Sequence, residues 1–316
     1  MTCDDRLMQI NNIEIAVLVP CYNEEAAIAG VVHDFRKVLP QAPVYVYDNN
    51  STDGTVEAAR AAGAVVRSEP LQGKGNVVRR MFADIEADIY VMVDGDNTYD
   101  STAAPVLIQK LLDESLDLVN GKRVHTETEA YRAGHQFGNV LLTSLVATIF
   151  GKRFEDMLSG YKVFSRRFVK SFPSLSSGFE IETELTVHAL ELRMPVAEVE
   201  TQYGTRPEGS ESKLSTFTDG FRILKMIAIL IKEERPLQFF SGLFGLFVVT
   251  SIILAIPVVS TYLETGLVPR FPTAILATGM MLLGFLCLAC GLILDTVTRG
   301  RQELKRLQYL NVNRSG

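Results

Sequence analysis

Short apolar runs alternate with helically spaced apolar positions over the first hundred residues. Apolar runs bounded by turn residues are typical of buried strands, and they occur at residues 13–19, 44–47, 64–67 and 89–93. Apolar positions between these runs predict helices over residues 24–38, 55–62 and 73–84. Ser51 or Thr52 is expected to cap the second helix. Strands alternating with helices of this length indicate β-α-β units, and therefore an α/β fold with a mostly parallel sheet between helices.

The second half of this body is less regular. We predict a strand at residues 118–120, an apolar helix at residues 137–150 and a further helix at residues 179–190. Glu180 and Glu184 share one face of the last helix. A like-charge pair at this spacing is slightly unfavourable unless a cation lies near it.

Two long uncharged segments follow. No Asp, Glu, Lys or Arg lies within residues 236–263 or within residues 271–294, and each segment exceeds the ~20 residues that span a bilayer. They predict a transmembrane hairpin over residues 236–298, with spans at about 237–262 and 272–296. Two buried core helices are the alternative, but neither segment has a polar face.

The segment that precedes the hairpin is amphipathic. Over residues 217–235, apolar positions at helical spacing oppose charged positions. This pattern predicts an interfacial helix that lies on the membrane surface, and a soluble packing helix is the alternative. The chain is thereby divided into an α/β domain at residues 1–216, the interfacial helix, the hairpin and a basic tail at residues 299–316.

Charge restricts the partners and the location. The net charge of −6 argues against nucleic acid, because binding to its phosphates needs a basic surface. Positive charge instead lies on both flanks of the hairpin, as Lys232, Arg235, Arg299, Arg301, Lys305 and Arg306. Arg270 is the only positively charged residue of the connector between the two segments. The positive-inside rule therefore predicts an integral membrane protein with the α/β domain and both termini in the cytoplasm, which means the cytoplasmic (inner) membrane if the source is bacterial.

Polar clusters follow several of the predicted strands. Asn23 and Glu24 follow the first strand, Asp48 the second, and Asp94-Gly95-Asp96 the fourth. A lone D-x-D after a strand is most simply a turn. The carboxyl ends of parallel strands lie at one edge of a sheet, however, which is where such sheets bind ligands. Together the clusters predict a site for a hard divalent cation, Mg²⁺ or Mn²⁺, that also binds substrate phosphates.

Four motifs carry a family resemblance. They are PCYNE at residues 20–24, DNNSTDGT at 48–55, GKG at 73–75 and DGD at 94–96. In this order they resemble glycosyltransferase family 2, and within it the polyprenyl-phosphate glycosyltransferases, the group that includes dolichyl-phosphate mannose synthase. The resemblance extends to about residue 235, and the two-span tail resembles membrane-anchored members. It implies a GT-A domain that binds a nucleotide sugar, and a metal-dependent transfer that inverts the anomeric carbon.

The resemblance also assigns the donor side, residue by residue. It implies that the nucleobase and ribose contact Pro20, Tyr22, Glu24 and Asp48. Lys74 would lie near the nucleotide, Asp94 would approach the ribose or metal, and Asp96 would bind the metal on the diphosphate. Two departures weaken parts of this assignment. Residues 49–50 are Asn-Asn where many members have Asp-Gly, and residues 97–98 are Asn-Thr where the mannose synthases tend to have Leu-Gln.

The acceptor side rests on three further motifs. GKR at residues 121–123 resembles the family's G-S-R element, DMLSG at 156–160 its D-x-x-S-G stretch, and residues 206–214 its R-x-x-G-x-S-K element with one extra residue. Arginine forks and lysine point charges recognise phosphate. The cations proposed to position the acceptor phosphate are Arg123, Arg132, Arg206 and Lys213. Asp156 is expected to orient sugar hydroxyls or the acceptor site.

These features predict a hexosyltransferase whose donor is a UDP- or GDP-linked hexose and whose acceptor is a membrane polyprenyl phosphate. The phosphate is already ionised near neutral pH, so no base is nominated among Glu180, Glu182 and Asp156. Alternatives are another membrane lipid acceptor, a nucleotidyltransferase and a non-catalytic membrane scaffold. A processive polysaccharide synthase is excluded, because its Q-x-x-R-W element needs a tryptophan and the chain has none. Homo-oligomers are expected through small residues of the hairpin, namely Gly242, Gly245, Gly279 and Gly284.

Overall fold

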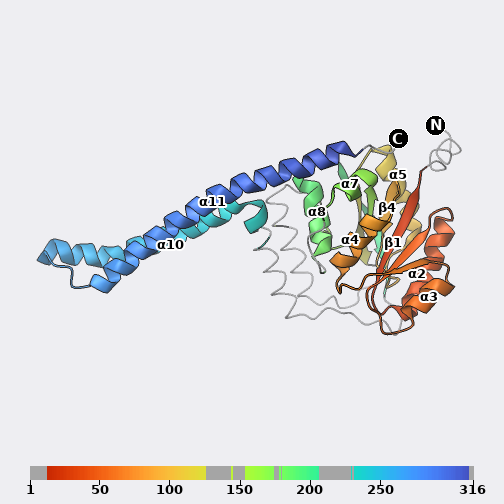
Figure 1. The fold of residues 1–316 in the computed structure, drawn as a ribbon, viewed down its shortest axis with the longest axis horizontal. Helices are drawn as coiled ribbons and strands as arrows, with labels where there is room; N and C mark the ends of the chain where they lie inside the picture. Colours follow the sequence, from red (N-terminus) through yellow and green to blue (C-terminus); the bar gives the residue numbers. More distant parts are fainter. Residues whose placement is uncertain are drawn as a thin grey trace. The chain divides into compact units, whose positions relative to one another are not determined.

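The computed structural model describes residues 13–125, 144, 154–173, 178, 180–205, 229 and 231–312 (Figure 1). The chain forms two compact units, one of Met1–Phe221 with Lys305–Gly316 and the other of Arg222–Leu304. The first unit contains the α/β domain, and the second contains the helical hairpin.

Within the described residues, a seven-stranded sheet with strand order β3-β2-β1-β4-β6-β5-β7 forms the centre of the first unit. The strands are β1 (Ile15–Cys21), β2 (Val44–Asp48), β3 (Val65–Ser68), β4 (Ile89–Met92), β5 (Leu118–His125), β6 (Lys162–Ser165) and β7 (Val196–Tyr203). β1 is parallel to β2 and β4, β2 to β3, and β5 to β7. β6 is antiparallel to both β4 and β5. The predicted α/β fold with a mostly parallel sheet is confirmed.

Helices cover both faces of this sheet (Figure 1). On one face lie α2 (Glu25–Val38), α3 (Thr55–Ala61) and, after the short 3-10 helix η1 (Ser101–Ala103), α5 (Ala104–Asp113). On the other face lie α4 (Lys74–Asp84), α7 (Arg166–Ser171) and α8 (Ile181–Glu191). Phe35 is 1% exposed in the first core, and burying a side chain of this size contributes about 1.5–3 kcal/mol. In the second core, Phe164 lies between Phe82 and Phe168 at ring-centroid distances of 5.7 and 4.7 Å.

The bounds predicted for the first hundred residues agree with the structure to within two residues. The predicted cap is wrong. The residue that precedes α3 is Gly54, with no side-chain capping bond, and the Ser51 hydroxyl accepts from the Asn23 amide instead. In the second half, the helix predicted at 179–190 corresponds to α8, and β5 extends beyond the predicted 118–120 because its polar residues pair with β7. Of the helix predicted at 137–150, only Ser144 is described, and it is helical.

Two of the described helices are long and apolar enough to cross a membrane, α10 (Pro236–Thr265) and α11 (Phe271–Asn311), and the second unit contains α10 and α11 as far as Leu304. Where they pack together, Gly284 lies against Phe244 and Phe247 of α10, and Ser251 donates to the Ala277 carbonyl at 2.7 Å. A side chain at residue 284 would press on those rings. Gly284, expected to serve an oligomer contact, therefore packs within the hairpin itself. Of the interfacial helix expected at 217–235, residues 217–228 and 230 lie outside the described residues.

The last turns of α11 belong to the first unit and contact α7, α8 and the residue before β5. Lys305 pairs with Glu191 at 2.7 Å. The Tyr309 hydroxyl donates to Asp117 at 2.7 Å, and Arg167 lies over the Tyr309 ring while also pairing with Asp117. Because Asp117 directly precedes β5, these contacts lie at the amino edge of the parallel strands, opposite the edge where ligands bind in such sheets.

Candidate active site

Hydrogen bonds tie the loop after β1 to the loop after β2. The Asn23 amide donates to Ser51 Oγ at 2.9 Å, and the Glu24 amide donates to Thr55 Oγ1 at 2.8 Å. In return, Asn23 Oδ1 accepts from the Thr52 amide at 2.8 Å. Asn23 has a positive φ of 51°, a conformation that asparagine tolerates better than most residues. The two loops therefore form one rigid wall at the carboxyl edge of the sheet.

The residues predicted to contact the nucleoside lie on this wall. Pro20 is on β1, and its neighbour Cys21 pairs in register with Asp48 of β2. Glu24 is 8% and Asp48 6% exposed, whereas Tyr22 is 37% exposed. The Asp48 carboxylate accepts from the Ser51 amide at 3.2 Å. The structure thus brings the four predicted residues to the ends of two adjacent strands.

Asn49 explains one departure from the family pattern. Its amide nitrogen donates to the carbonyls of Glu69 and Leu71 at 2.9 and 2.8 Å, and its oxygen accepts from the Gly73 amide at 2.6 Å. A carboxylate at this position could not donate to the two carbonyls. Asn49 therefore shapes the loop that leads to Lys74, the first residue of α4. Sequence reasoning noted the missing acid but did not find this role.

Lys74 joins the two halves of the domain. Its ammonium forms ion pairs with Asp94 at the end of β4 and with Glu182 of α8. Burial lowers the pKa of Lys74, but the two carboxylates outweigh burial and raise its pKa above the ordinary value. The ammonium is therefore charged. Sequence reasoning assigned Glu182 no role beyond its place among the carboxylates of this helix, and the structure makes it a partner of Lys74.

The Asp94-Gly95-Asp96 turn follows β4 directly. Asp96 is 4% exposed, and its Oδ1 accepts from the Thr98 hydroxyl at 2.6 Å and from the Thr98 amide at 3.3 Å. A Cβ at residue 95 would overlap Cys21 Sγ, so the turn needs glycine to pack against the end of β1. Thr98, the second departure, fixes the orientation of the Asp96 carboxylate. In the part of the chain that the structure describes, no group of three or more His, Cys, Asp and Glu side chains is placed to bind a metal.

The DMLSG stretch lies directly against this turn. A Cβ at residue 160 would overlap the Asp94 carboxylate, so Gly160 permits the close approach. The Gly160 amide donates to the buried Tyr99 hydroxyl at 2.8 Å. Burial raises the pKa of Tyr99, which therefore stays a neutral donor and acceptor. The predicted donor-side and acceptor-side motifs thus meet at Asp94 and Gly160.

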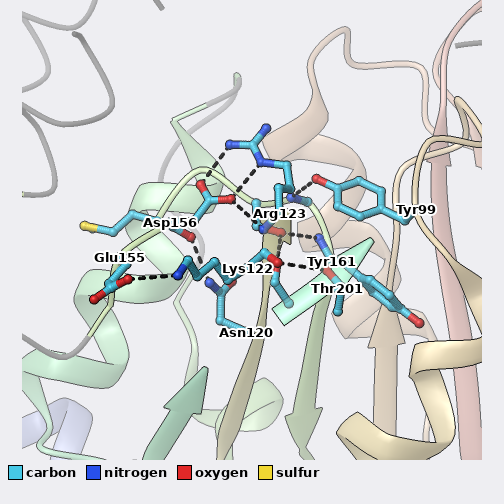
Figure 2. A network of polar contacts seen from close by, with 12 residues as sticks. Tyr99, Asn120, Lys122, Arg123, Glu155, Asp156, Tyr161 and Thr201 are labelled. Atoms are coloured by element: carbon cyan, nitrogen blue, oxygen red, sulfur yellow. Dashed lines mark hydrogen bonds and ion pairs between the residues drawn. The ribbon is translucent and has the colours of Figure 1, made fainter. Parts of the chain in front are cut away.

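Arg123 and Asp156 form a pair (Figure 2). Asp156 accepts from Arg123 Nε at 2.7 Å, Nη2 at 2.8 Å and the backbone amide at 3.2 Å. The guanidinium also lies 5.6 Å from the centroid of the Tyr203 ring. Burial raises the pKa of Asp156, but the bonds and charge of Arg123 outweigh burial and lower it. Asp156 is therefore an ionised partner of the arginine. The other predicted cations, Arg132, Arg206 and Lys213, lie outside the described residues.

Comparisons with known proteins agree with this geometry. The family model described as "Glycosyl transferase family 2" matches residues 16–172. Glycosyltransferase AglJ of Haloferax volcanii is 33% identical over 299 residues, which cover 94% of this chain and 98% of the relative. A dolichyl-phosphate hexose transferase of the same organism is 28% identical, over 70% of this chain and 96% of the relative.

A solved structure extends the agreement to three dimensions. Glucosyl-3-phosphoglycerate synthase from Mycobacterium tuberculosis, crystallised with Mn²⁺, UDP and glucosyl-3-phosphoglycerate, is 26% identical with a TM-score of 0.59. The match covers 73% of this chain and 84% of the synthase chain. The predicted GT-A fold and the family resemblance of the motifs are thereby confirmed. The chain belongs to glycosyltransferase family 2 and is a glycosyltransferase.

Proposed function

We propose that this glycosyltransferase transfers a hexose, with inversion, from a UDP- or GDP-linked donor to a membrane polyprenyl phosphate. The observation that carries the proposal is the contact of Asp94 with Gly160, because it brings the predicted donor and acceptor motifs together beside Arg123. The printed name of one relative, a dolichyl-phosphate hexose transferase, supports a lipid-phosphate acceptor.

On the donor side, we propose that Pro20, Tyr22, Glu24 and Asp48 contact the nucleoside, and that Asp94 and Asp96 bind Mg²⁺ or Mn²⁺. Carboxylate oxygens are the ligands that these hard cations prefer. Asp96 is the main ligand, because Thr98 orients it, whereas Asp94 already pairs with the Lys74 ammonium. When bound, the metal neutralises negative charge on the departing diphosphate. The synthase structure that contains Mn²⁺ and UDP supports this proposal.

On the acceptor side, Asp156 fixes the orientation of Arg123, and Arg123 positions the lipid phosphate together with Arg132, Arg206 and Lys213. A phosphate oxygen attacks the anomeric carbon as the bond from that carbon to the diphosphate oxygen breaks. The diphosphate leaves with the bonding electron pair, and the new bond forms on the opposite face of the sugar. A phosphate monoester has its second pKa near ~6, so a general base is not required.

The location follows from the hairpin. We propose that α10 and α11 cross the membrane as a pair, with the interfacial helix at residues 217–235 on its surface. The lysines and arginines on both flanks of the hairpin support an orientation with the catalytic domain and both termini in the cytoplasm. In this arrangement the acceptor phosphate is presented at the bilayer surface by the lipid itself.

The test uses the full chain in lipid nanodiscs. A thermal-shift panel of UDP- and GDP-sugars with Mn²⁺ or Mg²⁺ identifies the donor, and radiolabelled transfer to polyprenyl phosphate then tests the acceptor. A parallel arm offers 3-phosphoglycerate, because the solved relative was crystallised with glucosyl-3-phosphoglycerate. Transfer to the lipid alone supports the proposal. Transfer only to the soluble phosphate, or donor binding without any transfer, would contradict it.

A further inference from the structure

Lys162 is a fully buried lysine at the first position of β6, an interior strand of the sheet. It lies on β6 and pairs in register with Met92 of β4 on one side and Asn120 of β5 on the other. Its exposed fraction is 0%. Burying an ammonium is costly unless it is paired and hydrogen-bonded, so packing alone gives no reason for a lysine here.

The ammonium determines the orientation of one amide. Lys162 Nζ donates to Asn120 Oδ1 at 2.5 Å and to the Met157 carbonyl at 3.4 Å. With its oxygen directed at the ammonium, the Asn120 side chain presents its nitrogen to the Asp156 carbonyl and to Glu198 Oε1, both at 2.8 Å. The reverse orientation of the amide would direct a donor at a cation and an acceptor at a carbonyl.

Glu198 completes the attachment of the segment that precedes Asp156. Its carboxylate accepts from the Asp156 amide at 3.1 Å and from the Glu155 amide at 2.8 Å. Asn120 and Glu198 thus bind the backbone of residues 155–156, and Figure 2 shows Asn120 beside Asp156, whose side chain binds Arg123. A continuous series of hydrogen bonds therefore leads from the Lys162 ammonium through Asn120 and Asp156 to the Arg123 guanidinium.

The charges around Lys162 favour this role. Burial lowers the pKa of Lys162 to about 8, Asp156, Glu182 and Glu198 act to raise it, and Arg123 acts to lower it. The balance leaves the ammonium mostly charged at neutral pH. A cation at this depth also compensates the buried carboxylates that flank the site.

We infer that Lys162 is a positioning residue of the transfer reaction: through Asn120 it fixes the backbone at Asp156, and Asp156 fixes the guanidinium of Arg123. The inference rests on the proposed function only for the identity of the acceptor. Lys162 touches neither substrate. Its loss is expected to impair the acceptor side and to leave the donor side intact.

The first test is hydrogen exchange on the full chain with Lys162→Met, which keeps the length of the side chain and removes the ammonium. We expect faster exchange in the peptide that covers residues 154–160 and unchanged exchange in the β1 peptide. Lys122→Met is the matched control, because the half-exposed Lys122 pairs with Glu155 of the same segment and makes the same change of charge. Exposed pairs of this kind contribute little, so the control should exchange like the wild type.

The second test is steady-state kinetics with the donor identified as above and polyprenyl phosphate as acceptor. We expect Lys162→Met to lower kcat/KM for the acceptor by about 10²-fold, through a lower kcat or a higher acceptor KM. Small displacements of positioning groups have effects of this size. The donor KM should stay within about 2-fold of the wild type, well below that effect. Equal changes in donor and acceptor KM, or faster exchange throughout the domain, would mean a general loss of structure and would overturn the inference. Wild-type behaviour in both assays would overturn it as well.

Asn120→Asp provides a second route if Lys162→Met does not fold. It keeps the lysine and its partner atom but directs a carboxylate oxygen at the Asp156 carbonyl and at Glu198, so the same peptide should exchange faster. The exchange experiment needs no substrate. If the wild-type enzyme transfers no sugar to the lipid, the proposed function fails, while unchanged exchange in both variants remains the separate result that rejects the role of Lys162.

Discussion

The proposed donor and acceptor sides of the site orient their carboxylates by different means. Asp48 and Asp96 are held by amides and hydroxyls two or three residues further along the chain, such as Thr98 on Asp96. Asp156, in the loop before β6, is held by a charged partner on β5, Arg123, over a separation of 33 residues. Local turns need only the right short motif. A buried ion pair needs the complete sheet, because both charges must be desolvated and matched at once.

Lys74 is the exception that connects the two sides. It opens a helix of the donor half, yet it pairs with Glu182, 108 residues away. The proposed donor side therefore holds its carboxylates by partners nearby in the sequence, whereas its cation is held by a partner far away in the sequence. Substitutions of each kind separate the local contribution from the non-local one.

The largest effect is expected from Asp96→Asn. Loss of the proposed main metal ligand should lower kcat/KM for transfer by about 10³-fold, the scale seen when a preorganised electrostatic group is removed. The fold should be kept, because an amide oxygen can still accept from Thr98. Titration of Mn²⁺ should show weakened binding. Asp100→Asn is the control, since Asp100 caps η1 through Thr102. Transfer by Asp96→Asn at the wild-type rate would refute the metal site.

Next comes Lys74→Met. Removing the ammonium leaves Asp94 and Glu182 facing each other, so donor affinity should fall by about 10- to 100-fold while the protein loses thermal stability. Isothermal titration with the nucleotide sugar measures the first effect. The double variant with Glu182→Gln removes the unpaired charge and should recover part of the stability. Additive losses in the double variant would show that the two residues do not act as a pair.

Asn49→Asp tests the local scaffold on the donor side. The carboxylate cannot donate to the Glu69 and Leu71 carbonyls, and buried polar groups left unpaired cost about 3 kcal/mol together. Urea unfolding should detect this loss. Asn50→Asp is the control, because its amide bonds lie at the exposed surface. An equal loss in both variants would argue against a special role for Asn49.

The smallest effect concerns pH and the acceptor pair. Arg123 lowers the pKa of Asp156 below its ordinary value of 3.8, against the opposing effect of burial. A lowered folded-state pKa contributes stability above the ordinary value, and this contribution disappears as pH falls through the folded-state pKa. The wild type should exceed Asp156→Asn by about 2 kcal/mol at pH 6, with a smaller difference toward pH 3. Thermal unfolding across this range checks the trend, and a constant difference would contradict it.

Most of the donor half could be predicted from the sequence. The sequence predicted the strands at residues 13–19 and 89–93 because strand and helix periodicities are local. It predicted that the polar clusters after them lie together because parallel strands end at a common edge. The two long uncharged segments predicted membrane-spanning helices for a similar reason, since such a helix is recognised by its length and composition alone. The family motifs then supplied the expected role of each cluster.

The tertiary structure alone decided which distant residues meet. No spacing rule predicts that Gly160 lies against Asp94 or that Glu182 forms an ion pair with Lys74. Nor does any predict that β6 is inserted antiparallel between β4 and β5. Lys162 and Asn120 become partners only through that insertion. The physical reason is that a buried charge is stable only beside its complement, and the complement is chosen by strand order and register across the whole sheet, not by any local segment of the chain.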